Sequence, residues 1–149
     1  SGTEDECIEY IEKCRTEFKS LPPEEVSFPR TASNVEKWHS SSDLYGKGCP
    51  IHIRGAILYN HWTKKKDIDH KYATIQNGEK IKFCYLKTPN WMHENVISFI
   101  QDFPTELDLD KHVDYDLQFS QAFLDPIKVI LDCIGWETER KNTLESFFS

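Results

Sequence analysis

The sequence predicts a mainly helical α+β fold that contains one small antiparallel β-hairpin. Apolar residues recur every three or four positions near both ends of the chain, which indicates amphipathic helices. One internal segment alternates between apolar and polar residues, which indicates a strand. The chain has 149 residues, of which 38% are hydrophobic, and this is enough to bury the core of one ordinary domain. We therefore expect one domain with irregular ends.

The N-terminal segment predicts one amphipathic helix. Ser1-Gly2 is interpreted as a remnant of tag removal, and residues 1–3 are expected to be disordered, with Thr3 a possible helix cap. The apolar residues that follow have helical spacing, and the helix is expected to end before Pro22-Pro23. These apolar positions are Cys7, Ile8, Ile11, Cys14 and Phe18.

The next part of the chain predicts mostly irregular structure. Pro29 and the serine-containing region 31–42 are typical of loop, with a short turn around residues 35–38.

The stretch from Gly46 to Asn60 predicts a largely buried helix that begins near Pro50. Proline fits the first turn of a helix because its missing N–H would have no partner there. The alternation in Ile51-His52-Ile53 also permits a short strand, and we favour the helix. A phosphate near the helix N-terminus would meet free backbone donors and the positive end of the dipole, to which His52 and Arg54 could add side-chain donors. A partly buried histidine with an internal partner is the other interpretation of His52.

The charge of the chain is unevenly distributed. The net charge is −7, yet residues 47–87 contain nine basic and three acidic residues, which gives this region +6 and leaves −13 for the rest. Lys64, Lys65 and Lys66 form its densest part. Because charges act on a polyanion over only about 8 Å at physiological salt, the local field decides whether nucleic acid can bind. A solvated charged face without a ligand is an equal alternative on charge alone.

The segment Lys80 to Lys87 predicts the first strand of the hairpin, after turn residues at 76–79. Asn95 to Ile100 is the expected return strand. Alternation places Ile81, Phe83 and Tyr85 on an inward face and Lys80, Lys82 and Cys84 on an outward, charged face.

The segment Val113 to Trp136 predicts a helix in two pieces that meet at Asp125-Pro126, with Gly135 as the stop signal. Its apolar residues are expected to be core: Val113, Leu117, Phe119, Phe123, Leu124, Ile127, Val129, Ile130, Leu131 and Ile134.

The end of the chain carries three large apolar residues, Leu144, Phe147 and Phe148. Their spacing places them on one face of a helical turn, which is the form of a short anchor for a pocket on a partner. The alternative is that this segment folds back on its own core.

The cysteine and hydropathy patterns argue against a disulfide framework, a cysteine-based metal site and a membrane-spanning helix. The five cysteines are irregularly spaced and form no CxxC pair, which indicates reduced, mostly structural thiols. Cys49 and His52 have ligand-like spacing, but no second pair completes a metal site, so no metal is expected. No apolar run approaches the roughly 20 residues of a membrane helix, so we expect a soluble, intracellular protein.

Four ordered segments carry a family resemblance that extends from about Glu4 over nearly the whole chain. They are GCPIHIRGAILYN, NGEKIKF, VDYDLQFSQAFLDPIKVILDCIGW and KNTLESFF. Together they resemble the C-terminal thumb of family B replicative DNA polymerases from T4-like bacteriophages. The resemblance implies a thumb-type domain at 4–136, followed by a C-terminal segment at 137–149 with a clamp-binding motif. It further implies an origin in the cytoplasm of an infected bacterial host.

The resemblance also implies partners and binding residues. The expected partners are double-stranded primer-template DNA, a sliding clamp and the palm, fingers and exonuclease part of a polymerase. Duplex contacts carry over to His52, Arg54, Lys64, Lys65, Lys66, Lys80 and Lys82. Clamp binding carries over to Leu144, Phe147 and Phe148, although Lys141 stands where such motifs often begin with glutamine.

The residues that catalyse polymerisation are missing from this chain. Nothing resembles the DTDS or SLYPS segments of the family, whose palm carboxylates hold two metal ions. The acidic pairs Asp108 with Asp110 and Asp114 with Asp116 are interpreted as helix-start residues. We therefore expect no catalytic residue, no cofactor and no polymerisation by this chain alone, with magnesium held by the absent palm. The chain is either an excised domain or the smaller product of a polymerase encoded in two pieces.

Two alternatives from other classes remain open. An acidic body with an apolar C-terminal anchor also fits a protein-interaction module that does not bind DNA, with its lysines merely solvated. A small hydrolase that uses Cys49 or a histidine is the third interpretation, although no set of nucleophile, base and orienting group is visible.

Overall fold

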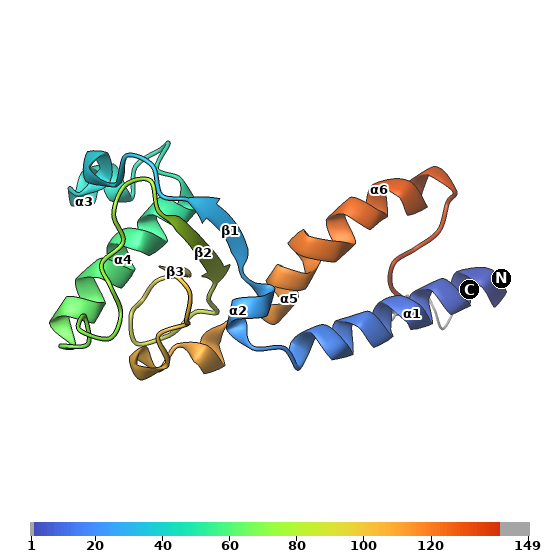
Figure 1. Ribbon diagram of the computed structural model, residues 1–149. Coiled ribbons are helices and arrows are strands. Elements are labelled where there is room, and N and C mark those ends of the chain that lie inside the picture. The colour runs from blue at the N-terminus through green and yellow to red at the C-terminus, as the bar shows by residue number, and fades with distance from the viewer. Residues whose placement is uncertain (1, 141–149) are drawn as a thin grey trace. The chain divides into compact units, whose positions relative to one another are not determined.

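The computed structural model describes residues 2–140 and shows an α+β fold (Figure 1). The expected clamp-binding residues Leu144, Phe147 and Phe148 lie outside the described residues. The helices are α1 (Gly2–Lys19), α2 (Pro23–Val26), α3 (Ser41–Leu44), α4 (Ile51–Lys65), α5 (Tyr115–Phe119) and α6 (Asp125–Cys133). The strands are β1 (Phe28–Thr31), β2 (Lys80–Tyr85) and β3 (Val96–Phe99). Single-turn helices are η1 (Val35–Trp38), η2 (Thr105–Leu107), η3 (Asp110–His112) and the π-helical η4 (Ser120–Leu124).

The contacts of the chain define two compact units. One unit consists of residues 22–114 and contains the sheet, and the other combines residues 2–21 with 115–140 and is helical. This division was not expected, because the apolar patterns of the sequence are compatible with one continuous core. That residues 4–136 act as one domain therefore stays a prediction.

The unit of residues 22–114 is built on an antiparallel sheet with the strand order β1-β2-β3. The expected strands at 80–87 and 95–100 are confirmed as β2 and β3, which pair directly. Helix α4, expected after Pro50, is also confirmed and packs on β3 (Figure 1). Gly55 permits this close approach, since a Cβ built there would lie 2.5 Å from Ser98 Oγ.

The sequence does not predict strand β1, because Pro29 is typical of loop. Proline is tolerated in an edge strand, where its missing N–H breaks no ladder bond in the sheet interior. β1 is such an edge, and Phe28 pairs with Phe83 of β2. The expected hairpin is therefore a three-stranded sheet.

The expectation that one face of β2 presents charge outward is wrong for two of its three residues. Cys84 is fully buried, and Lys82 is half-buried with Nζ 3.1 Å from the carbonyl oxygen of Glu24. Helix α2 contributes Glu24 and so covers this face. Only Lys80 is exposed as expected.

The helical unit contains the expected N-terminal helix, which begins earlier than the sequence predicted. Gly2 and Thr3 belong to α1, so they are neither a disordered start nor a cap. Helix α1 packs against α5, and the Phe18 and Phe119 rings meet edge-on at 5.3 Å. The buried cluster of this unit consists of Ile11, Phe119, Leu124 and Leu131.

The expected break at Asp125-Pro126 takes the form of a π turn in a continuous helical path. Pro126 cannot donate a backbone hydrogen bond, so the regular i to i−4 ladder cannot pass through it. The five residues of η4 absorb this defect, and Leu124 keeps helical angles (φ −66°, ψ −48°). Gly135 ends α6 as expected: its φ is +74°, and the N–H of Trp136 donates to the carbonyl of Leu131 at 3.0 Å.

The expectation that the apolar residues of the last helix are core is wrong for one stripe of α6. Val129 and Ile130 of α6 are 68% and 65% exposed, Ile134 directly after α6 is 56% exposed, and Leu117 of α5 is 36% exposed. Helical spacing of apolar residues shows that they share a face, but it does not show that a neighbour covers that face. Within residues 2–140, no helix is long and apolar enough to cross a membrane.

Candidate functional site

The N-terminal turn of α4 holds His52 against the sheet. The His52 ring lies 6.2 Å from the Phe83 ring, and its backbone carbonyl accepts a hydrogen bond from Ser98 Oγ at 2.8 Å. Burial lowers the pKa of His52, and the nearby Arg30 lowers it further, while a hydrogen bond with the backbone of Thr31 opposes the shift. His52 is therefore mostly neutral at pH 7, and it can offer a hydrogen bond to a phosphate but little charge.

Arg54, in the same first turn of α4, forms an internal ion pair. Its Nη1 lies 2.9 Å from Glu94 Oε2, and the two side chains are only 18% and 11% exposed. The Tyr45 hydroxyl also donates to Glu94, and the Arg54 guanidinium lies 5.8 Å from the Tyr45 ring centre. A phosphate would have to compete with Glu94 for Arg54. The role of Arg54 that the structure supports is therefore the stabilisation of the fold.

Lys64, Lys65 and Lys66 lie at the opposite end of α4 from His52. At a rise of about 1.5 Å per residue, His52 and Lys65 are roughly 20 Å apart along the helix axis. The chain therefore does not gather the expected binding residues of α4 into one site. Lysines in the last turn also stabilise the helix through its dipole, which is a structural role that needs no ligand.

The three lysines differ in their surroundings. Lys64 and Lys65 are exposed, and neither forms an ion pair within residues 2–140. Lys66 instead lies over two tryptophan rings, with Nζ 4.9 Å from the centre of Trp91 and 6.0 Å from that of Trp62. Its charge is thus partly satisfied by the aromatic faces.

The lysines of β2 lie on the side of the sheet opposite to His52. Alternation along β2 points Lys80 and Lys82 away from the face that carries Phe83. On the Phe83 face the structure places Arg30, whose guanidinium lies 5.2 Å from the ring centre. The sequence does not indicate Arg30 as a site residue, because Pro29 is typical of loop and not of a strand. Arg30 pairs with Ile81, so it lies on the same face of the sheet as Phe83.

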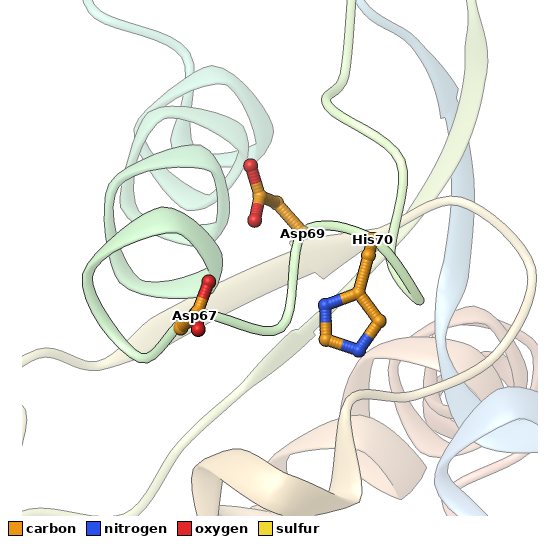
Figure 2. A group of neighbouring side chains, drawn as sticks. All are labelled: Asp67, Asp69 and His70. Atoms are coloured by element: carbon orange, nitrogen blue, oxygen red, sulfur yellow. The ribbon is translucent and has the colours of Figure 1, made fainter.

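One group of potential metal ligands follows α4, namely Asp67, Asp69 and His70 (Figure 2). One ligand atom from each lies within 4.8 Å of the others, and all three side chains are exposed. Exposed carboxylates this close together are common without an ion, and nothing else in the described chain points to a ligand here. We therefore assign no metal to this group. Cys49 and His52 are not part of any such group among residues 2–140.

The cysteines show no reactive arrangement in the described chain. All five are free thiols, and Cys84 is fully buried. Burial raises the pKa of Cys84 to about 12 and also raises the pKa of Cys49. Neither thiol is primed to form a thiolate near neutral pH, which argues against the interpretation of the chain as a hydrolase that uses Cys49.

Comparison with known proteins identifies one relevant relative and no family. No family model matches the chain. The chain is 24% identical over 149 residues to the DNA-directed DNA polymerase of Enterobacteria phage T4. The match covers 97% of this chain, which spans only 16% of the length of that relative. Nearly the whole chain is therefore similar to one segment of a bacteriophage DNA polymerase.

Proposed function

We propose that this chain is the thumb part of a family B DNA-directed DNA polymerase and holds primer-template duplex through sequence-independent phosphate contacts. The observation that carries the proposal is the similarity of nearly the whole chain to a segment of the T4 polymerase. The segment that matches is 16% of the length of that polymerase, and we infer a role for this segment alone. Because it has no counterpart of the palm carboxylates, it is not expected to polymerise alone, and magnesium would be held by the palm.

The exposed lysines of the sheet-containing unit support the proposal more strongly than His52 and Arg54 do. Lys64, Lys65 and Lys80 are exposed and form no ion pair within residues 2–140, so each is available to a phosphate. Point charges on flexible side chains fix position along a nucleic-acid backbone without reading bases. Binding through them depends steeply on salt and not on sequence.

The proposal includes two protein partners. The remaining part of the polymerase would supply the active site, and a sliding clamp would take the C-terminal residues Leu144, Phe147 and Phe148. Such a complex would work in the cytoplasm of an infected bacterium. Truncation after Asn142 tests the clamp contact separately: clamp affinity that is unchanged by the truncation would remove this partner and leave the duplex contact standing.

A second candidate function is protein binding without DNA binding, and one observation favours it. Val129 and Ile130 on α6 are more than 60% exposed, and Tyr10 on α1 is 63% exposed. Neighbouring large apolar side chains that are exposed, such as Val129 and Ile130, are typical of a contact with another protein. This observation fits a joint with the rest of a polymerase as well as it fits an independent adaptor.

Charge reversal separates the two candidates. We would compare the double variant Lys64→Glu, Lys65→Glu with the double variant Lys13→Glu, Lys128→Glu, which changes the net charge equally at exposed lysines of the helical unit. The proposal expects weaker duplex binding and a smaller salt slope for the first variant only. Equal loss in both variants would show that only the overall charge matters, and no loss in either would favour the protein-binding candidate.

A further inference from the structure

An open hollow of about 420 Å³ lies between η1, the C-terminal half of α4 and the segment 74–77. It is separate from the His52 and Arg54 region, and its residues come from three parts of the chain. The residues of its lining that matter below are Val35, His39, Asn60, Lys64, Ile75 and Gln76.

The walls of the hollow are fixed by side-chain hydrogen bonds to the backbone. The Asn60 amide bridges both backbone groups of Ile75: Nδ2 donates to the Ile75 carbonyl at 3.0 Å, and Oδ1 accepts from the Ile75 N–H at 2.8 Å. The N–H of Val35 donates to Asn77 Oδ1 at 2.7 Å, which joins η1 to the segment 74–77. The hollow is therefore present before any ligand arrives, and binding would cost little ordering of the backbone.

The hollow offers hydrogen-bond donors that have no internal partner. Lys64 and His39 are exposed on its lining, and neither forms an ion pair or a side-chain hydrogen bond within residues 2–140. Glu36 is the acidic residue of the lining, and it accepts a hydrogen bond from the Asn77 amide. An anion would approach the Lys64 and His39 side, where ammonium and imidazole donors are available.

We propose that this hollow binds one nucleotide unit of a nucleic-acid strand, with the phosphate on Lys64 and His39 and the sugar toward Val35, Ile75 and Gln76. The volume falls in the range of roughly 300 to 1,000 Å³ that is typical of small-molecule sites. The buried side chains of Val35 and Ile75 offer an apolar floor, and Gln76 offers polar groups at the edge. This inference rests on the proposed function and deepens it, because it names one place where the strand is held.

The first test compares three alanine variants against a fluorescent duplex and a single-stranded oligonucleotide. Lys64→Ala and His39→Ala are the test variants, and Lys111→Ala is the control, since Lys111 is an exposed lysine outside the hollow. Loss of a charge-assisted contact from Lys64 should weaken binding about tenfold and lower the salt slope by about 0.7 to 0.9. His39→Ala should weaken binding without a comparable change in salt slope. The inference would be overturned if both test variants bound the probes as tightly as the control variant does.

The variant Glu36→Gln tests for a phosphate in the hollow. A purely structural role of Glu36 does not predict tighter binding in this variant. The substitution removes the acidic charge of the lining and keeps an oxygen that can accept from Asn77. Binding to both probes should become several-fold tighter, because the phosphate no longer meets a nearby carboxylate. Unchanged or weaker binding by a variant with unchanged unfolding free energy would contradict a phosphate in this hollow.

A final titration separates this inference from the proposed function. Thymidine monophosphate and inorganic phosphate are added to the isotope-labelled chain, and backbone amide shifts are followed. Shifts at His39, Lys64 and Gln76 with the nucleotide, without duplex binding, would support the hollow and contradict the proposed function. Duplex binding without amide shifts in the hollow, with either nucleotide or oligonucleotide, would support the proposed function and contradict the inference about the hollow. Equal shifts with phosphate alone would reduce the site to a phosphate site and overturn the nucleotide contact.

Discussion

Arg54 and Glu94 form an ion pair in which Nη1 and Oε2 are 2.9 Å apart, and it joins the N-terminal half of α4 to the segment that precedes β3. Both side chains are largely shielded from water, at 18% and 11% exposed. Arg54 was expected from the sequence to bind phosphate. Its pairing with Glu94 shows that it stabilises the fold.

The first prediction concerns this pair. Arg54→Met leaves the Glu94 carboxylate shielded and without its cation, so the free energy of unfolding should fall by about 2 to 3 kcal/mol. The double variant Arg54→Met, Glu94→Met should lose less than the sum of the single variants, because neither charge is then stranded. Urea denaturation measures both. A neutral effect on stability together with weaker duplex binding would show that Arg54 serves DNA instead.

The second prediction concerns the packing of α4 on β3. Gly55→Ala should destabilise the sheet-containing unit by about 1 to 3 kcal/mol, because the new Cβ would lie 2.5 Å from Ser98 Oγ and 2.9 Å from Ser98 N. Gly2→Ala is the matched control, since nothing lies within 4 Å of a Cβ at that helical position. Thermal unfolding measures the effect. Equal stability of both variants would mean that α4 does not approach β3 this closely.

The third prediction concerns pH. The pKa of His52 is lowered mainly by burial, so the folded state favours the neutral ring more than the unfolded state does. Stability from this group is present above the ordinary histidine pKa near 6.5 and is lost as pH falls through the lower folded pKa. His52→Gln should therefore show a smaller loss of stability between pH 7.5 and pH 5 than the unchanged chain. A loss of the same size in both proteins would exclude His52 as a source of the acid sensitivity.

The fourth prediction concerns the apolar stripe of α6. Val129→Gln with Ile130→Gln should change the free energy of unfolding by less than about 0.5 kcal/mol, because both side chains are already exposed. Leu131→Ala, one position further, should cost about 2 to 4 kcal/mol because Leu131 belongs to the buried cluster. Denaturant midpoints compare them. A large loss from the double variant would show that the stripe is covered in solution.

The same α6 double variant also tests whether the exposed stripe contacts the rest of a polymerase. If the stripe joins this chain to the rest of a polymerase, the variant should bind that part more weakly in a pull-down with both purified pieces, while its duplex binding stays unchanged. Equal recovery with both forms of the chain would remove the stripe from that joint.

Local patterns were sufficient to predict the regular elements. Proline placement and apolar spacing predicted α1 and α4, and alternation predicted β2 and β3, because each signal lies within a few consecutive residues. Strand β1 could not be predicted, because Pro29 is typical of loop. The segment becomes an edge strand only through its pairing with β2.

The arrangement of the candidate site could not be predicted in the same way. The basic residues are near one another in the sequence, yet α4 carries His52 and Lys65 to opposite ends of the helix, and alternation turns Lys80 away from His52. The pairing of Arg54 with Glu94 joins residues 40 positions apart, and no local pattern encodes it. The same is true of the hollow at Lys64, whose walls come from three separate segments.

The most direct test of duplex binding is a titration of the chain against a fluorescent primer-template duplex at several salt concentrations, with a second duplex of unrelated sequence alongside. We expect the logarithm of the binding constant to fall linearly with the logarithm of salt concentration, with a slope of about 0.9 per phosphate contacted, and to be equal for both sequences. Binding that differs between the sequences, or no binding even at low salt, would contradict the proposal that this chain holds DNA by its phosphates.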